Sequence, residues 1–329
     1  MLGIWKRPLG FALGLGLATM LAPAWAAPTV AQPGALNYVE GQARIGDQLV
    51  TSKSVGSTAL NAGDVLSTGN GRAEILLTPG IFMRVGKNSA IRMDTPELTN
   101  TRVEVLKGEA MVEADLLHKE DHVVVAERGA LTELEKTGVY GFDADNGTVR
   151  VYDGKVNVLE GDQRVELKKG KEALVGQPLQ SQKFDRDAAQ AADPLYSWSK
   201  LRSEYLAEAT AATAQTYVVG GGGWYGPGWY WNPYWSMYSF VPGNGFFYNP
   251  FGWGLYSPVY FYNAPLYPRF YGRAYAGGSR AIVPPAGRFG GGFVGRGAQA
   301  PAQAPMPRTA PSAPMMRSAS PMMGGGRRR

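Results

Sequence analysis

The sequence predicts an all-β protein, in which stacked antiparallel sheets form a β-sandwich or a rolled sheet, followed by one α-helix and a largely unstructured tail. Between residues 34 and 176, glycine-centred turn signals recur about every eight to twelve residues. Between those turns, apolar and polar residues alternate, which is typical of strands with one buried face. A single amphipathic stretch follows at 193–214, and the composition then shifts to Gly, Pro, aromatic residues and Arg.

The chain opens with a predicted secretory signal peptide, residues 1–26. Lys6 and Arg7 supply its charged start, residues 9–21 are apolar, and Ala-Trp-Ala at 24–26 is a small-x-small cleavage site. The alternative is a membrane anchor, but a span needs about 20 apolar residues and this stretch is shorter. We therefore expect an exported chain that is periplasmic, envelope-associated or secreted, with no membrane span after cleavage of the leader.

Charge is distributed unevenly along the chain, whose formal net charge is +6. Glu208 is the last acidic residue, and the ten charged residues beyond it are all arginines, from Arg269 to Arg329. Without those ten and the two basic residues of the leader, the total of 33 falls to 21 basic residues against 27 acidic ones. A mildly acidic body with a cationic tail is typical of an interaction segment. The chain has no cysteine, which excludes disulfides and thiolate metal sites.

Residues 34–176 form the predicted β domain. Val103 and Val105 alternate with Arg102 and Glu104, as expected of a strand with one wet face. Later strands of the domain repeat this alternation.

Asp153-Gly154 is predicted to be a two-residue hairpin turn that joins strands at 149–152 and 155–159. Such a turn needs a positive φ at both central positions, and Asp-Gly adopts that conformation at low cost. Asp153 and Gly154 are therefore the predicted structural turn of the domain.

Several segments of the β domain together resemble the FecR domain, a family of exported or periplasmic β modules named for an iron-responsive envelope regulator. Each segment alone is generic, and the resemblance depends on their order along the chain. It implies an all-β module that works at the cell envelope. The segments are Gly63–Gly69, Arg72–Leu77, Arg84–Ser89, Leu106–Ala110 and Val149–Val156.

The resemblance is incomplete in two respects. Regulatory members of the family carry a cytosolic anti-sigma segment and a transmembrane helix before this domain, whereas this chain opens with the predicted leader. Lys136-Thr137-Gly138 replaces the usual Gly-Thr before the late strands. Direct signal transfer to a sigma factor is therefore not expected.

A helix is predicted to begin at Asp193-Pro194 and to end near Ala214. Asp193 can cap the first amides, and proline suits the first helical position because no N–H is needed there. We expect its apolar face to pack on the β domain; the alternative is a partner-binding helix. That face comprises Leu195, Trp198, Leu201, Tyr205 and Leu206, whereas Lys200, Arg202, Glu204 and Glu208 are expected to point elsewhere.

Residues 217–275 are rich in Gly, Pro and aromatic residues, and 276–329 form a low-complexity Arg, Pro, Met and Gly tail that is predicted to be disordered. Frequent prolines exclude long helices and central strands. Exposed rings could stack on sugars, on each other or on arginine; alternatively, they fold back onto the β domain or form a linker. The candidate interaction residues are Trp224, Trp229, Trp231, Trp235, Trp253, Arg327, Arg328 and Arg329.

The sequence carries no clear catalytic or metal-binding signature. His118 and His122 are the only histidines, and their spacing suits zinc only on a helix. The valines around them indicate a charged turn between two strands instead. The sequence has no Gly-x-Ser-x-Gly, phosphate-loop or dinucleotide-binding motif. We predict a protein that is not an enzyme and that uses no cofactor or metal.

These observations predict an exported interaction or scaffold protein of the cell envelope. Its β module would position an aromatic, cationic tail that binds envelope polymer, protein partners or itself. The alternative is a periplasmic component of a FecR-type signalling system. Arginine with aromatics also suits single-stranded nucleic acid, but an exported protein rarely meets it, so no nucleic-acid partner is expected.

Overall fold

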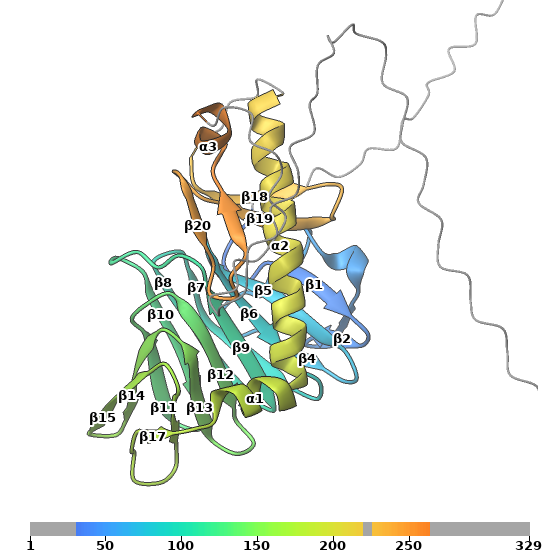
Figure 1. The fold of residues 1–329 in the computed structure, drawn as a ribbon. Helices are drawn as coiled ribbons and strands as arrows, with labels where there is room; N and C mark the ends of the chain where they lie inside the picture. The colour runs from blue at the N-terminus through green and yellow to red at the C-terminus, as the bar shows by residue number, and fades with distance from the viewer. Residues whose placement is uncertain (1–30, 220–225, 264–329) are drawn as a thin grey trace, which may run out of the picture. The chain divides into compact units, whose positions relative to one another are not determined.

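A computed structural model describes residues 31–219 and 226–263, which lie within one compact unit of the chain (Figure 1). The predicted signal peptide, Trp224, the segment 276–329 and the arginines at 327–329 lie outside the described residues. Within the two described ranges, no helix has both the length and the apolar character that crossing a membrane requires.

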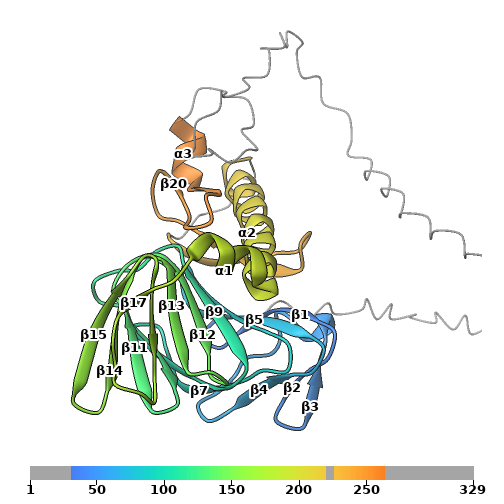
Figure 2. The same ribbon diagram turned by 60° about the horizontal axis from the view of Figure 1, so that its bottom comes forward.

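Two large sheets stack face to face (Figure 2), which confirms the predicted stacked sheets and, of the two predicted forms, the β-sandwich. In spatial order, the first sheet contains β1 (Leu36–Glu40), β5 (Arg72–Thr78), β6 (Ile81–Val85), β9 (Glu109–Ala114), β12 (Gly138–Asp143), β13 (Thr148–Asp153), β16 (Lys171–Leu174) and β17 (Gln182–Lys183). The second contains β15 (Gln163–Lys168), β14 (Lys155–Glu160), β11 (Ala130–Leu134), β10 (His122–Glu127), β8 (Asn100–Lys107), β7 (Ala90–Glu97), β4 (Val65–Thr68), β2 (Ala43–Ile45) and β3 (Gln48–Val50). A short 3-10 helix, η1 (Ser52–Ser54), follows β3.

Neighbouring strands in both sheets are antiparallel, except that β8 and β10 run parallel. The predicted alternation holds on β8, where Val103 and Val105 are buried and Arg102 and Glu104 lie half-exposed on the other face. The main core fills the space between the sheets. It is built from inward-facing side chains of both, among them Leu36, Ile75, Ile91, Val103, Val112, Val125, Phe142 and Val149.

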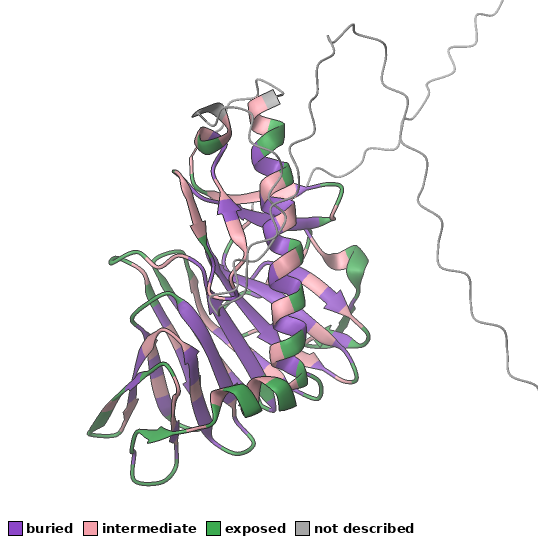
Figure 3. Ribbon diagram, viewed as in Figure 1, coloured by how far each residue is buried: buried purple, intermediate pink, exposed green. Residues whose placement is uncertain are grey.

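The central strands of the first sheet are buried on both faces. Every residue of β6 is buried, as are nearly all residues of β5 and β9 (Figure 3). The outer face of this sheet is covered by the long helix and by the segment that follows it. The sheet is therefore an inner layer, with the sandwich core on one side and a second apolar layer on the other.

The predicted hairpin at Asp153-Gly154 is wrong. β13 and β14 belong to different sheets: Asp153 pairs with Val139, whereas Lys155 pairs with Lys168. Gly154 has a φ of +94°, and a Cβ there would lie 2.2 Å from the Tyr140 hydroxyl. The glycine is therefore needed for a corner that carries the chain from one sheet to the other. The sequence predicts a turn here, but it does not reveal which strand pairs with β13 and which with β14.

Two helices follow the sandwich, α1 (Arg186–Ala192) and α2 (Pro194–Val219). The backbone amides of Leu195 and Tyr196 donate to Oδ1 of Asp193, at 2.7 and 3.0 Å, which confirms the predicted cap. The helix continues beyond the predicted end at Ala214.

The buried face of α2 differs from the predicted stripe. Leu195, Trp198 and Leu206 are buried, which confirms that the helix docks on the β domain, but Leu201 and Tyr205 are 46% and 38% exposed. Arg202, expected to point elsewhere, is only 4% exposed. The reason is that α2 crosses charged side chains of the first sheet, so its docked face carries their polar partners. A docked face that is predicted from the spacing of apolar residues leaves out polar residues that are buried by ion pairing.

Residues 226–263 form secondary structure, so the expectation of a largely unstructured tail after the helix needs correction for this part. β18 (Gly228–Asn232) pairs with β19 (Met237–Val241), β20 (Phe246–Tyr248) pairs with β21 (Gly254–Tyr256), and α3 (Pro258–Asn263) follows. Tyr238, Phe240 and Leu255 are buried in a cluster with residues of α2 and the first sheet. The aromatic residues of this part therefore fold back onto the β domain, and they do not form a linker. The aromatic segment needs no core of its own because it docks on a surface made elsewhere in the chain.

Candidate functional site

The turn between β18 and β19 is fixed to α2 by one side chain. Asn232 is buried, and its Nδ2 donates to the carbonyl of Ala209 at 3.2 Å and to Oγ1 of Thr213 at 3.0 Å. Its Oδ1 accepts from the backbone amides of Tyr234 and Trp235, at 3.0 and 3.2 Å. The conformation of the turn is therefore held by a polar anchor below it.

This turn projects aromatic rings from the molecule. Tyr234 is 86% exposed, and its ring centroid lies 5.5 Å from that of the half-buried Trp235. The ring centroid of Tyr205 on α2 lies 5.7 Å from that of Trp235. Ser236 closes the turn with a φ of +48°, which is uncommon for a residue other than glycine. We call Tyr205, Tyr234 and Trp235 the aromatic patch.

The other described candidate tryptophans point inward. Trp229, Trp231 and Trp253 are half-buried and pack against the cluster below α2. Trp231 lies so close to Gly56 that a Cβ on this glycine would be 2.6 Å from the indole. These three rings dock the segment on the β domain. Trp235 packs against the same cluster and also contacts Tyr205 and Tyr234 of the aromatic patch.

A buried charge network lies between the first sheet and α2, and the sequence analysis missed it. Arg84 of β6 pairs with Glu74 of β5 at 2.8 Å and with Glu113 of β9 at 2.7 Å, and all three side chains are fully buried. Arg202 of α2 pairs with the second oxygen of Glu74 at 2.9 Å. Two guanidinium groups therefore face two carboxylates.

Uncharged side chains bind the same carboxylates from other parts of the chain. Ser203 of α2 and Asn249 of the aromatic segment donate to Oε1 of Glu113, at 2.6 and 3.1 Å. Asn37 of β1 donates to Oε1 of Glu74 at 2.9 Å and accepts from the backbone amide of Tyr238 at 2.7 Å. The network therefore joins the sandwich, the helix and the aromatic segment.

The titration behaviour of the network agrees with its geometry. Burial favours the neutral form of Glu74, but Arg202 and Arg84 outweigh it and lower the pKa of this carboxyl. Burial and the neighbouring Glu113 carboxylate together raise the pKa of Asp115 well above its usual value. The two arginines lie within ion-pair distance of the carboxylates of Glu74 and Glu113. Paired charges of this kind indicate that the network has a structural role and holds α2 on the first sheet.

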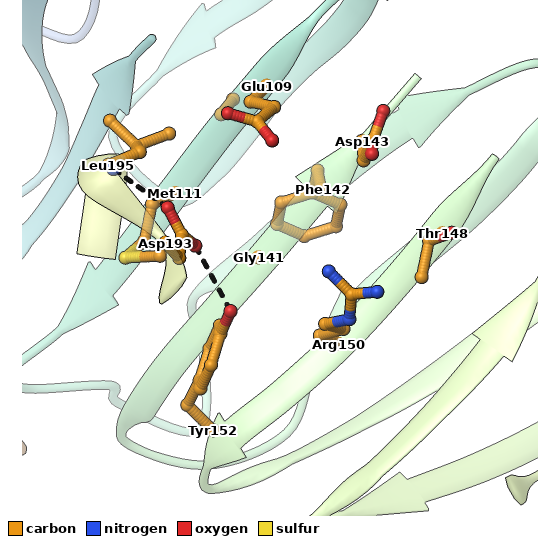
Figure 4. Close-up of a pocket in the computed structure, with 11 residues that line it drawn as sticks. Glu109, Met111, Gly141, Phe142, Asp143, Thr148, Arg150, Tyr152, Asp193 and Leu195 are labelled. Carbon is orange, nitrogen blue, oxygen red and sulfur yellow. Dashed lines mark hydrogen bonds between the residues drawn. The ribbon is translucent and has the colours of Figure 1, made fainter. Parts of the chain in front are cut away.

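Figure 4 shows a small cavity where the first sheet meets the start of α2. Its volume is about 20 Å³, which is room for roughly one water molecule. A larger groove of about 360 Å³ adjoins it and shares Glu109, Arg150 and Asp193.

Asp193, Arg150 and Glu172 of this groove have structural partners. Asp193 caps α2 and accepts from the Tyr152 hydroxyl at 3.1 Å, as Figure 4 shows. Arg150 pairs with Glu172 at 2.7 Å. Burial, with Asp193 as the largest charge contribution, raises the pKa of Glu109. These side chains therefore serve to cap α2 and to pair with one another, and the groove does not indicate a particular ligand.

The two histidines lie in and next to the loop between β9 and β10, as predicted. His118 is in the loop, and His122 is the first residue of β10; both are exposed. In the part of the chain that the structure describes, no three His, Asp or Glu residues are placed to hold a metal ion together.

The architecture defines a β-sandwich module with a helix and an aromatic layer docked on one sheet. Residues 64–162 match the protein family described as FecR protein, so the chain contains a FecR-like domain. This confirms the resemblance drawn from the ordered segments between Gly63 and Val156. No curated protein matches the chain.

Two solved structures of a candidate anti-sigma factor from Parabacteroides distasonis ATCC 8503 are similar to part of the chain. Their sequence identities are 17% and 18%, and both TM-scores are 0.34. Each similarity covers 39% of this chain and 63% or 62% of the other. The chain therefore spans less than two-thirds of either structure, and neither carries a functional argument.

Proposed function

We propose that this protein is an exported interaction module of the bacterial envelope. Its FecR-like sandwich and α2 act as a rigid support, and its aromatic segment binds an envelope polymer, a protein partner or another copy of the chain. The arginines between Arg269 and Arg329 add attraction for anionic partners.

The observation that carries this proposal is the aromatic patch. Large rings that are exposed singly on a surface are ordinary, but Tyr234, Trp235 and Tyr205 lie side by side. Their turn is also pre-ordered by Asn232. Pre-ordered Tyr and Trp side chains contribute much of the binding energy at interfaces, because little conformational entropy is lost when they bind. The patch therefore suits recognition.

The test is binding of the full-length chain to isolated envelope fractions. We expect Tyr234→Ser together with Trp235→Ser to weaken co-sedimentation with cell-wall or membrane fractions, or self-association, by about tenfold. Tyr234→Ser alone should weaken it less and leave the thermal melt unchanged, because this side chain is 86% exposed. Leu98→Ser, which changes another apolar side chain that is 52% exposed, is the control and should have no effect on binding.

Two results would contradict the proposal. Unchanged binding by the doubly substituted chain would remove the patch from the interaction. Specific capture of one membrane protein by both the wild-type and the doubly substituted chain would instead favour the signalling alternative.

A further inference from the structure

A separate cavity lies where the aromatic segment meets the first strand and the loop after η1. Its volume is about 290 Å³. The described residues that line it are all uncharged, and most of them carry a hydroxyl or an amide. They include Gln32, Ser57, Thr58, Ala59, Asn61 and Tyr238.

One side of the cavity is aromatic and firmly placed. Tyr238 is buried and donates its hydroxyl to the carbonyl of Gly56 at 3.4 Å. Trp231 packs edge to face on Tyr238, with ring centroids 5.0 Å apart at 70°, and also contacts Gly56. The positive φ of Gly56, +81°, and the nearby indole leave no room for a side chain at this position. This side of the cavity is therefore held by contacts within the protein.

The lining decides which chemistry fits. A charged ligand would enter a site without a counter-charge among its lining residues, which is costly. The Ser57 hydroxyl, the Asn61 amide nitrogen and the Tyr238 hydroxyl already donate within the protein, at 3.2, 3.1 and 3.4 Å. A purely apolar ligand would displace water from the other polar groups of the lining, the Gln32 amide and the Thr58 hydroxyl among them, without replacing its hydrogen bonds. An uncharged ligand with many hydroxyl groups avoids both costs. A volume near the lower end of the usual range for ligand pockets, about 300–1,000 Å³, suits a small ligand with a single ring.

We propose that this cavity binds one uncharged sugar ring, such as the terminal pyranose of an envelope polysaccharide. This inference deepens the proposed function and depends on it only for the source of the sugar. Ser57, Thr58, Asn61 and Gln32 supply the polar groups at the cavity, and Tyr238, which Trp231 packs against, lines it from the aromatic segment. The proposal gives the aromatic segment a second role, as one wall of a saccharide site.

The test is saturation-transfer NMR and tryptophan fluorescence with the full-length chain. The probes are glucose, galactose, mannose and N-acetylglucosamine, compared with the charged glucuronate and glucosamine. We expect at least one uncharged sugar to bind in the millimolar range and both charged sugars to bind at least about tenfold more weakly. Equal binding of the charged probes, or no binding of any uncharged probe, would overturn the proposal.

A matched pair of variants localises the binding. Ser57→Trp places a bulky side chain at the cavity, whereas Ser52→Trp changes another exposed serine, in η1, that does not line it. The first should weaken sugar binding at least about tenfold and the second should leave it unchanged. If both substitutions changed sugar binding to the same extent, the sugar would bind outside this cavity. The chain with Tyr234→Ser and Trp235→Ser should still bind the sugar, so failure of the proposed function and failure of this site can be told apart.

Discussion

Arg202 of α2 places its Nη2 2.9 Å from Oε1 of Glu74 on β5, and the two side chains are 5% and 0% exposed. The same guanidinium lies 4.0 Å over the ring of Tyr38. The contact joins residues that are 128 positions apart and fixes the helix on the first sheet. Buried charges are tolerated only when they are paired, so the loss of either side chain would leave the other charge buried with fewer partners.

Replacing Arg202 by methionine should destabilise the protein by about 3–5 kcal/mol, because Glu74 would lose one of its two cationic partners while it stays buried. Urea denaturation of the full-length chain measures the change. Lys200→Met, on the same helix but half-exposed, should cost less than about 0.5 kcal/mol. A similar stability of both variants would show that the network does not hold the helix.

Replacing Gly154 by alanine should destabilise the protein by about 1–3 kcal/mol or more. The residue has a φ of +94°, and the new Cβ would lie 2.2 Å from the Tyr140 hydroxyl and 2.7 Å from the carbonyl of Thr137. Gly161→Ala is the control, because it also has a positive φ, +55°, but no atom within 4 Å of the new Cβ. Thermal melts should therefore fall further for Gly154→Ala. Equal losses would mean that conformation alone, without the contact, sets the cost.

Replacing Trp198 by alanine should cost about 3–5 kcal/mol, because the indole is only 7% exposed and leaves a large cavity when removed. Its ring lies 6.1 Å from Tyr38 and 5.4 Å from the guanidinium of Arg72. Chemical denaturation compares it with Leu201→Ala, a 46% exposed position on the same helix, which should lose less than about 1 kcal/mol. If the Trp198 variant unfolds like the wild type, the helix does not contribute docking energy.

Glu127 predicts a pH dependence of stability. It is fully buried in the sandwich, and neither carboxylate oxygen has a hydrogen-bond partner among the described residues. Burial raises its pKa from 4.5 to about 7; Asp143 adds to this shift and Arg128 opposes it. The folded state thus keeps a proton that the unfolded state has lost. The free energy of unfolding should therefore fall as the pH rises from about 4.5 to 7, by on the order of 3 kcal/mol, and level off above.

The measurement for Glu127 is the difference between the wild type and Glu127→Gln across pH 4–8. The glutamine variant should lose this component, so the two stability curves should diverge most between about pH 4.5 and 7. Glu97→Gln, at an exposed carboxyl on β7, should follow the wild-type curve. Parallel curves for the wild type and Glu127→Gln would mean that Glu127 titrates alike in the folded and unfolded states.

The buried charge network has a readable signal in the sequence. Glu74, Arg84 and Glu113 lie on the outward face of their strands, as alternation predicts. Each has a large apolar neighbour two residues away on the same face, respectively Leu76, Phe82 and Met111. Apolar side chains on a supposedly wet face indicate that something covers it. What covers it follows only from contacts between distant segments.

The sequence by itself determined the sandwich, the start and cap of the long helix, and the FecR-like order of its segments. Those features depend on alternation, glycine turns and capping, which act over a few residues. The tertiary structure alone decided that β13 and β14, on either side of Gly154, belong to different sheets, that Arg202 is buried, and that the aromatic segment is ordered. In each case the outcome depends on a partner far along the chain, because burial and ion pairing depend on distance in space.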